Sequence, residues 1–277
     1  MLFYKLLIII MISTPLLHSY EEGVVQNDDV SIYYRDYGPK DADPILLVQG
    51  LGGQLINWPD HLIEFLIENN FRPIVFDNRD TGLSSKIKSD LFTKENTAQT
   101  ITRTYIKYFL RLPLKPVYDL DDMANDSVAI LDGLDINEAH LLGIALGGMV
   151  AQLIASNHPR RVKTFTLISS STSAPSPFNG PSRDVRKLLM KRSNNPYATM
   201  DERIQRSKKI FTVIGLEGYD LETEDFYNKS KESIERAGDD DTGFSRQIMA
   251  ILGSKDRIKK VKKIQAKTLI IHGDKDP

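Results

Sequence analysis

The sequence predicts an α/β fold: a doubly wound, mostly parallel sheet with a helical lid inserted before the last predicted strand. Three observations support this prediction. Continuous apolar runs, typical of strands buried on both faces of a parallel sheet, recur along the chain. Segments with helical periodicity alternate with these runs, as they do in doubly wound sheets. Between residues 169 and 255 the strand signals stop and only helical patterns remain.

The expected strands fall into two kinds. Asp29–Tyr37 alternates polar and apolar residues, which predicts an antiparallel edge strand. The continuous apolar runs are Pro44–Val48, Pro73–Phe76, Ala139–Leu142, Thr164–Ile168 and Thr268–Ile271. Helices are expected between them at Asp60–Asn69, Asp119–Leu134 and Leu146–Asn157.

The domain organisation follows from where these signals begin and end. Residues 24–174 are expected to form the core, residues 175–255 the helical lid, and residues 256–277 a return to the core. Within the lid, helices are expected near residues 184–192, 200–214, 222–236 and 244–252. Such an insert covers the carboxyl edge of the sheet, where open α/β sheets bind their ligands.

The first residues have the pattern of a secretory signal peptide. A short basic start at Met1–Lys5 precedes an apolar run over Leu6–Leu17, and Ser19 precedes an acidic pair. A run of roughly a dozen apolar residues is too short to span a bilayer and fits a signal peptide over residues 1–19. We therefore expect a secreted or periplasmic protein without stable membrane association after cleavage. The alternative is an uncleaved N-terminal membrane anchor.

Composition excludes several classes of function. The chain is 41% hydrophobic and 26% charged, as soluble globular domains are, and its formal net charge of −1 argues against a nucleic-acid partner. With no cysteine there is no disulfide, thiol nucleophile or zinc–thiolate site. The five histidines form no HxxxH or HxH pair, so we expect no metal ion and no other cofactor. The composition carries no signal for an oligomeric state.

One glycine-rich segment carries most of the functional information. Gly143-Ile144-Ala145-Leu146-Gly147 lies between an apolar strand and a helix rich in small residues. A sharp strand-to-helix turn needs such glycines, and G-x-S-x-G at this place exposes a nucleophilic serine above the sheet. Here the central residue is Ala145. We expect Ala145 to have a positive φ, a conformation that residues with a Cβ usually avoid.

Three further loops follow predicted strands in the expected order. Gln49–Gly53 follows the first apolar strand, at the place where hydrolases carry a loop that donates a backbone N–H to the oxyanion. Phe76–Ser84 follows the next strand, and His272–Asp276 follows the last apolar strand. Asp77 and Arg79 either tie loops together through bidentate hydrogen bonds or bind a substrate carboxylate, and we favour the structural role.

With these motifs the sequence resembles the α/β-hydrolase superfamily, and within it the branch of aclacinomycin methylesterase-like serine hydrolases. The matching segments are G-L-G-x-Q from Gly50, W-P from Trp58, D-N-R-D-x-G-L-S from Asp77, D-D-M-x-x-D from Asp121 and G-x-S-x-G-G-M from Gly143, the last except at Ala145. The resemblance extends over roughly residues 25–277 and is weakest in the lid.

The resemblance implies a role for each matching residue. Ala145 stands at the nucleophile's position, and the backbone N–H groups of Leu51 and Leu146 are the implied oxyanion donors. Asp276 is the implied triad acid, with Asp274 as its local rival. In this fold the triad histidine follows the acid by some tens of residues. The sequence ends at Pro277, directly after Asp276, so we expect the chain to be C-terminally incomplete relative to the family.

The function implied for the parent enzyme is hydrolysis of an ester, or less readily an amide, of a small or medium apolar molecule by a Ser-Asp-His mechanism. This chain is expected to be inactive, because a methyl group has neither a lone pair nor a transferable proton. The resemblance gives structural positions to the four histidines that follow the signal segment, which are His61, His140, His158 and His272. The alternatives are a non-catalytic binding protein or pseudoenzyme with the hydrolase fold, and a partial or decayed gene product.

If the chain is C-terminally incomplete, as expected, the Thr268–Ile271 strand lacks its usual neighbouring strand and helix. We therefore expect this strand to be an exposed apolar edge.

Overall fold

The computed structural model describes residues 19–173, 180–193, 198–215, 220–238 and 242–276. The expected signal peptide over residues 1–19 therefore lies, apart from Ser19, outside the described residues, as does Pro277. Across the ranges that are described, none of the helices combines the length and the apolar character needed to cross a lipid bilayer.

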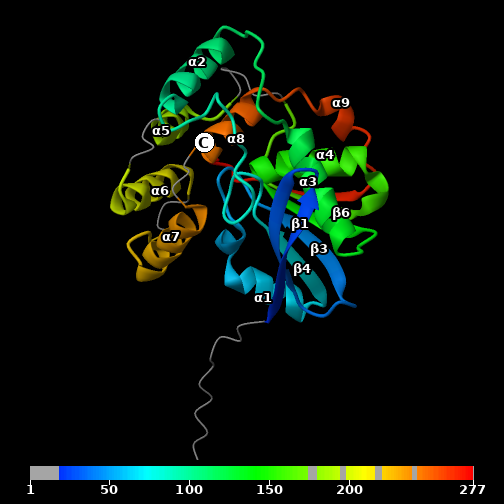
Figure 1. The fold of residues 1–277 in the computed structure, drawn as a ribbon. Helices are drawn as coiled ribbons and strands as arrows, with labels where there is room; N and C mark the ends of the chain where they lie inside the picture. Colours follow the sequence, from blue (N-terminus) through cyan, green and yellow to red (C-terminus); the bar gives the residue numbers. More distant parts are fainter. Residues whose placement is uncertain (1–18, 174–179, 194–197, 216–219, 239–241, 277) are drawn as a thin grey trace, which may run out of the picture.

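The described residues form a sheet of seven strands in the order β1-β2-β4-β3-β5-β6-β7 (Figure 1). The strands are β1 (Tyr20–Asn27), β2 (Val30–Tyr37), β3 (Asp43–Val48), β4 (Phe71–Phe76), β5 (Ala139–Ile144), β6 (Val162–Ile168) and β7 (Lys267–Ile271). The pairs β1–β2 and β2–β4 are antiparallel, and all the other pairs are parallel. The expected doubly wound, mostly parallel sheet is confirmed.

The antiparallel end of the sheet differs from the expectation. β2, expected to be the edge strand, is covered along its whole length by β1, with Tyr20 opposite Tyr37 and Asn27 opposite Val30. The sequence of β1 did not predict a strand, because most of its side chains are exposed and it has no apolar run. Backbone hydrogen bonds to β2, rather than burial, hold β1 in place.

The helices agree closely with the periodicity of the sequence, and α4 and α6 have the expected bounds. They are α1 (Asp60–Glu68), α2 (Thr97–Phe109), α3 (Leu120–Gly133), α4 (Leu146–Asn157), α5 (Arg183–Ser193), α6 (Met200–Ile214), α7 (Glu224–Ala237), α8 (Gly243–Leu252) and α9 (Ile258–Val261), with short 3-10 helices η1 (Leu55–Asn57) and η2 (Pro159–Arg161). α2 was not predicted, because its buried face includes Thr97, Thr104, Tyr105 and Tyr108 and does not read as an apolar stripe.

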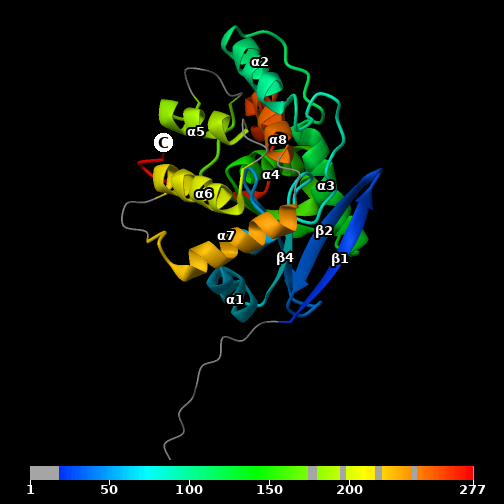
Figure 2. The ribbon, with the colours of Figure 1, turned by 60° about the vertical axis from the view of Figure 1, so that its left-hand side comes forward.

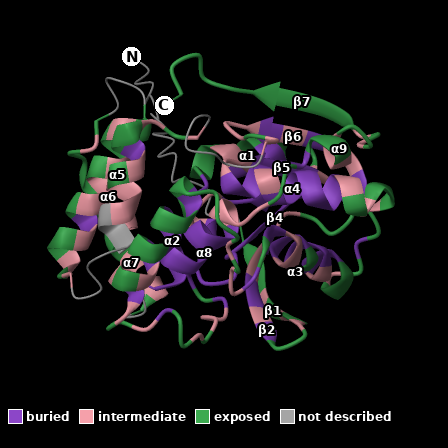
Figure 3. Ribbon diagram, turned by 90° about the horizontal axis from the view of Figure 1, so that it is seen from above, coloured by how far each residue is buried: buried purple, intermediate pink, exposed green. Residues whose placement is uncertain are grey.

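The two faces of the sheet pack against different helices. Alternation along β3 sends Leu46 into a cluster with α3 and α4, and Leu47 into a second cluster with α1. The first cluster is the larger of the two, and the helices and strands around it are mostly buried in Figure 3. Because the core strands from β3 to β6 are covered in this way, their carboxyl ends are held in fixed register, and the loops that follow them are positioned together.

β7 is the exception among the parallel strands. Its apolar run predicted a strand buried on both faces, but all five of its residues are exposed, with 66% of Ile270 accessible. β7 pairs only with β6 and lies at the edge of the sheet, as Figure 3 shows, and among the described elements no helix packs closely over either of its faces. This agrees with the expectation of an exposed apolar edge.

α5, α6 and α7 lie together on one side of the molecule, away from α3 and α4 (Figures 1 and 2). α6 contacts both α5 and α7, and α7 also contacts η1 of the core. Where burial is described in these helices, their residues are mostly exposed or half-buried, and Val185 and Ile204 are the buried apolar residues. α8, in contrast, is buried over most of its length.

Candidate functional site

The strand-to-helix turn at Ala145 has the strained geometry that the sequence predicts. β5 continues two residues beyond its expected end, to Ile144, and α4 begins at Leu146. Ala145 between them has φ 51° and ψ −114°, an uncommon conformation for a residue with a Cβ. Its N–H donates to the carbonyl of Ile168 at 2.9 Å, and its carbonyl accepts from the Ser170 hydroxyl at 2.7 Å. The turn is therefore fixed from both sides.

A glycine makes this turn possible. A Cβ built on Gly147 would lie 2.0 Å from the carbonyl oxygen of Val48, a distance that no side chain could occupy. The first turn of α4 can therefore lie directly against the end of β3 only because residue 147 has no side chain. This contact brings the N-terminus of α4 beside the loop that follows β3.

The loop after β3 supplies the second half of the site. A Cβ built on Gly50 would lie 3.4 Å from the Cβ of Ala145, so this loop passes directly beside the turn. The N–H groups of Leu51 and Leu146 donate to no acceptor among the described residues. Two free backbone donors at a strained turn, one of them at a helix N-terminus, are the arrangement that binds a developing or full negative charge on oxygen.

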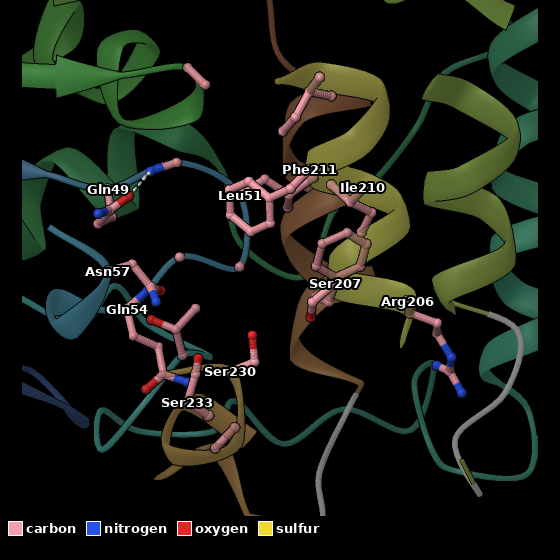
Figure 4. Close-up of a pocket in the computed structure, with 18 of the residues that line it drawn as sticks. Gln49, Leu51, Gln54, Asn57, Arg206, Ser207, Ile210, Phe211, Ser230 and Ser233 are labelled. Atoms are coloured by element: carbon pink, nitrogen blue, oxygen red, sulfur yellow. Dashed lines mark hydrogen bonds between the residues drawn. The ribbon is translucent and has the colours of Figure 1, made fainter. Parts of the chain in front are cut away.

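A cavity of about 520 Å³ lies above this turn, between the core and the lid helices. Figure 4 shows Leu51 from the core beside Phe211 and Ile210 from α6, which form an apolar wall. Further apolar residues that line the cavity are Trp58, Ile144, Val185, Leu188, Leu189, Ile214, Ile234 and Phe244. Ala145 also lines the cavity, so its methyl group lies where a nucleophile would meet a ligand.

The segment after β4 ties the surroundings of the cavity together. The Asp77 carboxylate is fully buried and accepts the backbone N–H groups of Leu55 at 2.8 Å and Leu83 at 2.9 Å. Arg79 forms a bidentate pair with Asp126 of α3, with N···O distances of 2.6 and 2.8 Å. Burial alone lowers the pKa of Arg79, but the hydrogen bonds to Asp126 outweigh it and raise that pKa above its usual value, so the guanidinium stays charged. The structural role expected for Asp77 and Arg79 is confirmed.

α8 holds the same loops from the other side. Arg246 and Asp80, both buried, form a bidentate pair with N···O distances of 2.9 and 2.6 Å. The amide of Gln247 accepts the N–H of Gly52 at 2.9 Å and donates to the carbonyl of Arg79 at 2.9 Å. The loop that carries the free Leu51 N–H is thereby fixed to the loop after β4.

Arg236 of α7 makes several bonds to the core, and we call this side chain the lid latch. Arg236 donates to Asp77 Oδ2 at 2.7 Å and to Gln54 Oε1 at 3.1 Å, and its guanidinium lies over the ring of Tyr33. Gln54 in turn donates to the carbonyl of Ser233 at 2.5 Å. These bonds fix the end of α7 over η1 and close one side of the cavity.

The structure brings together only some of the residues that the sequence singled out. Ala145 and Leu51 line the cavity, whereas Leu146, which follows Ala145 at the start of α4, and Asp276 do not. Asp276 and Asp274 lie in the exposed loop after β7, and the Asp276 carboxylate lies 3.4 Å from Nε2 of His272. None of the histidines among the described residues lines the cavity.

Sequence reasoning missed Arg236, Arg246 and Gln247. A signal for the last two was present, because an Arg-Gln pair interrupts the otherwise apolar helix α8. Buried polar residues of this kind need partners, which the sequence alone does not identify. Arg236 gave no comparable signal, since it is one of many charged residues in α7.

Comparisons with known proteins identify the family to which the chain belongs. Residues 43–277 match the family model described as the alpha/beta hydrolase fold, and the chain belongs to that family. The chain is 26% identical over 231 residues to rhodomycin D methylesterase DnrP of Streptomyces peucetius, an alignment that covers 78% of this chain and 69% of the relative. It is 24% identical over 268 residues to a non-heme chloroperoxidase of Burkholderia pyrrocinia, covering 91% and 81% of the two chains.

A solved structure shows the same fold. The enol-lactonase of Burkholderia xenovorans LB400 superposes with a TM-score of 0.64 at 18% identity, covering 92% of this chain and 81% of the lactonase. The family has members that act on small-molecule esters, which is consistent with a small-molecule ligand for this chain.

Proposed function

We propose that this protein binds the carbonyl of a small or medium apolar ester in the cavity between core and lid, and that it does not hydrolyse the ester through a serine nucleophile. The carbonyl oxygen accepts hydrogen bonds from the N–H groups of Leu51 and Leu146. The observation that carries the proposal is the turn at Ala145, which keeps the geometry of a nucleophile's position but presents only a methyl group.

The wall of the cavity supports an apolar ligand. Leu51, Phe211 and Ile210 lie beside one another at the cavity in Figure 4. Burying the acyl chain of an ester against such side chains stabilises the complex by about 25 cal/mol per Å² of apolar surface. The ester carbonyl is the only strong acceptor in a simple alkyl ester. The free N–H groups of Leu51, which lines the cavity, and of Leu146, which follows Ala145, can both donate to that single acceptor.

The same residues support the lack of covalent catalysis. Covalent catalysis in this fold requires a nucleophile at residue 145 and a base within hydrogen-bonding reach of it. Ala145 supplies no nucleophile, and no described histidine lines the cavity. The described site therefore has neither a serine to attack a bound ester nor a histidine to accept the proton of that serine.

The single tryptophan of the chain provides the test. Trp58 is buried and lines the cavity, so its fluorescence reports occupancy. Methyl octanoate and methyl octyl ether differ at the carbonyl but have the same length. We expect both to change the fluorescence, with the ester binding roughly fivefold more tightly through its carbonyl. Gas chromatography after overnight incubation should recover the ester intact.

Two results would contradict the proposal. Equal dissociation constants for the ester and the ether would show that no N–H group recognises the carbonyl. An absence of any fluorescence change with either compound would show that the cavity does not bind apolar molecules of this size.

A further inference from the structure

Three serines of the lid helices line the cavity. Ser207 comes from α6, one turn before Ile210 and Phe211, and Ser230 and Ser233 come from α7, one helical turn apart. In Figure 4 these three serines lie around the lower part of the cavity, with Gln54 and Asn57 of the core beside them. The lid helices therefore offer hydroxyl groups as well as apolar side chains to a ligand.

The three hydroxyl groups have no partner among the described residues. Helical serines commonly donate to the carbonyl four residues earlier, as the hydroxyl of Thr212 does to Lys208 at 2.9 Å. The hydroxyls of Ser207, Ser230 and Ser233 make no such bond to any described residue, although all three are half-buried at the cavity. Each of them therefore remains able to both donate to and accept from a ligand.

The charged residues of the cavity are already engaged. Asp80 is paired with Arg246, and both Arg203 and Arg206 take part in interactions within the protein. In Figure 4 the side chain of Arg206 extends away from Ser230 and Ser233. The three serine hydroxyls are neutral and can each exchange hydrogen bonds with a neutral hydroxyl group of a ligand.

We infer that the serine face formed by Ser207, Ser230 and Ser233 binds a neutral, hydroxyl-bearing group, so that the ligand is an acyl ester of a polyol. The acyl chain lies against Leu51 and Phe211, and the hydroxyl groups of the polyol exchange hydrogen bonds with the serine face. This inference rests on the proposed function, because it places the ester carbonyl at the N–H groups of Leu51 and Leu146.

The test compares two esters with the same acyl chain. Monooctanoylglycerol carries two free hydroxyls and methyl octanoate carries none, and Trp58 fluorescence gives a dissociation constant for each below the concentrations at which micelles form. We expect the glycerol ester to bind about fivefold more tightly for each hydrogen bond that its hydroxyls make. The variants S207A, S230A and S233A are measured singly, with N228A on the exposed side of α7 as the matched control.

The inference predicts that at least two of the three serine variants reduce the preference for the glycerol ester roughly fivefold, while their affinity for methyl octanoate and the behaviour of N228A stay unchanged. Unchanged binding of methyl octanoate also shows that each variant is folded. A glycerol ester that binds no more tightly than methyl octanoate, or a preference that survives all three substitutions, overturns the inference and leaves the proposed function standing. If methyl octanoate itself does not bind, the proposed function fails.

Discussion

The core side and the lid side of the cavity are built in different ways. On the core side, backbone atoms and buried ion pairs define the geometry: the turn at Ala145, the free Leu51 N–H and the Arg79–Asp126 pair. On the lid side, half-exposed side chains line the cavity, and Arg236 makes the one buried ion pair that we find between described residues of α5–α7 and the core.

This difference separates two properties of the site. In the proposed function, the core side fixes where a carbonyl oxygen lies, without help from the side chain of residue 145. In the further inference, the lid side selects what else the ligand carries, through Phe211 and the serine face, which line the cavity. A substitution at residue 145 can therefore abolish the chemistry while the binding geometry remains in place.

The largest expected effect concerns the core. Asp126→Ala leaves the buried Arg79 guanidinium without its bidentate partner and also removes the acceptor for Asn27. Leaving such a charge unpaired costs about 3–5 kcal/mol, and we expect the free energy of unfolding in urea to fall by that amount. A loss under about 1 kcal/mol would show that the core side is not held by this pair.

The lid latch is expected to matter less for global stability. Arg236→Ala removes the hydrogen bonds to Asp77 and Gln54, but Asp77 keeps its two backbone donors. We expect a loss of about 2 kcal/mol, with faster amide hydrogen exchange in α7 and unchanged exchange in α4.

Lys229→Ala is the control for the latch, because Lys229 also joins α7 to the core but through an exposed pair with Asp60 at 3.4 Å. Its effect should stay below about 1 kcal/mol. If Lys229→Ala and Arg236→Ala accelerated exchange in α7 equally, the latch would not be the main attachment of that helix.

A smaller effect of the opposite sign is expected at the turn. Ala145→Gly removes the Cβ from a residue with a positive φ and should stabilise the protein by about 1 kcal/mol in urea denaturation. The same exchange within α4, Ala151→Gly, should destabilise it, because glycine disfavours a helix interior and the methyl group is buried. Destabilisation by both changes would mean that Ala145 is not strained.

The smallest predicted effect depends on pH. Burial raises the pKa of Asp121, but hydrogen bonds from Lys260 and Asn157 outweigh it and leave that pKa below its ordinary value. A lowered folded-state pKa means that the contribution to stability is present above the unfolded pKa, near 3.9, and is lost as the pH falls through the folded value. Because Asp121 and Lys260 are nearly half exposed, the contribution is under about 1 kcal/mol.

Urea denaturation of the parent protein and of Asp121→Asn checks this assignment. The parent should be slightly more stable at pH 7, and the difference should shrink as the pH falls below about 4. A difference that did not change between pH 7 and pH 3 would assign the contribution to packing instead.

The sequence predicted the core side of the site more completely than the lid side, for a physical reason. The turn at Ala145 depends on local requirements, glycines beside a strained residue, and these are visible within five consecutive residues. The start of α6 is likewise marked by a local signal, because Thr199 and Glu202, three residues apart, form a capping box there.

What the sequence did not predict depends on contacts between distant residues. Arg236 meets Asp77 across 159 positions, and Gln247 meets Gly52 across 195. Neither partner can be chosen without the fold, because each helix offers several polar residues. β1 was missed for the related reason that it is held by pairing with β2 and not by its own apolar pattern.

The central claim is that the site binds an ester carbonyl but lacks a serine nucleophile. The most direct measurement follows p-nitrophenolate release from p-nitrophenyl butyrate and Trp58 fluorescence in the same sample. For both the parent and Ala145→Ser, mass spectrometry of the intact protein after exposure to a fluorophosphonate shows whether a covalent adduct has formed. The parent should show saturable binding, no release above buffer and no phosphonate adduct. Ala145→Ser should also show no turnover, because no described histidine lines the cavity to take the serine proton.

Release by the parent that a fluorophosphonate abolishes, with a stoichiometric adduct, would contradict the claim and place a nucleophile elsewhere in the chain. Turnover by Ala145→Ser alone would show that one of the four described histidines, His61, His140, His158 or His272, acts as its base.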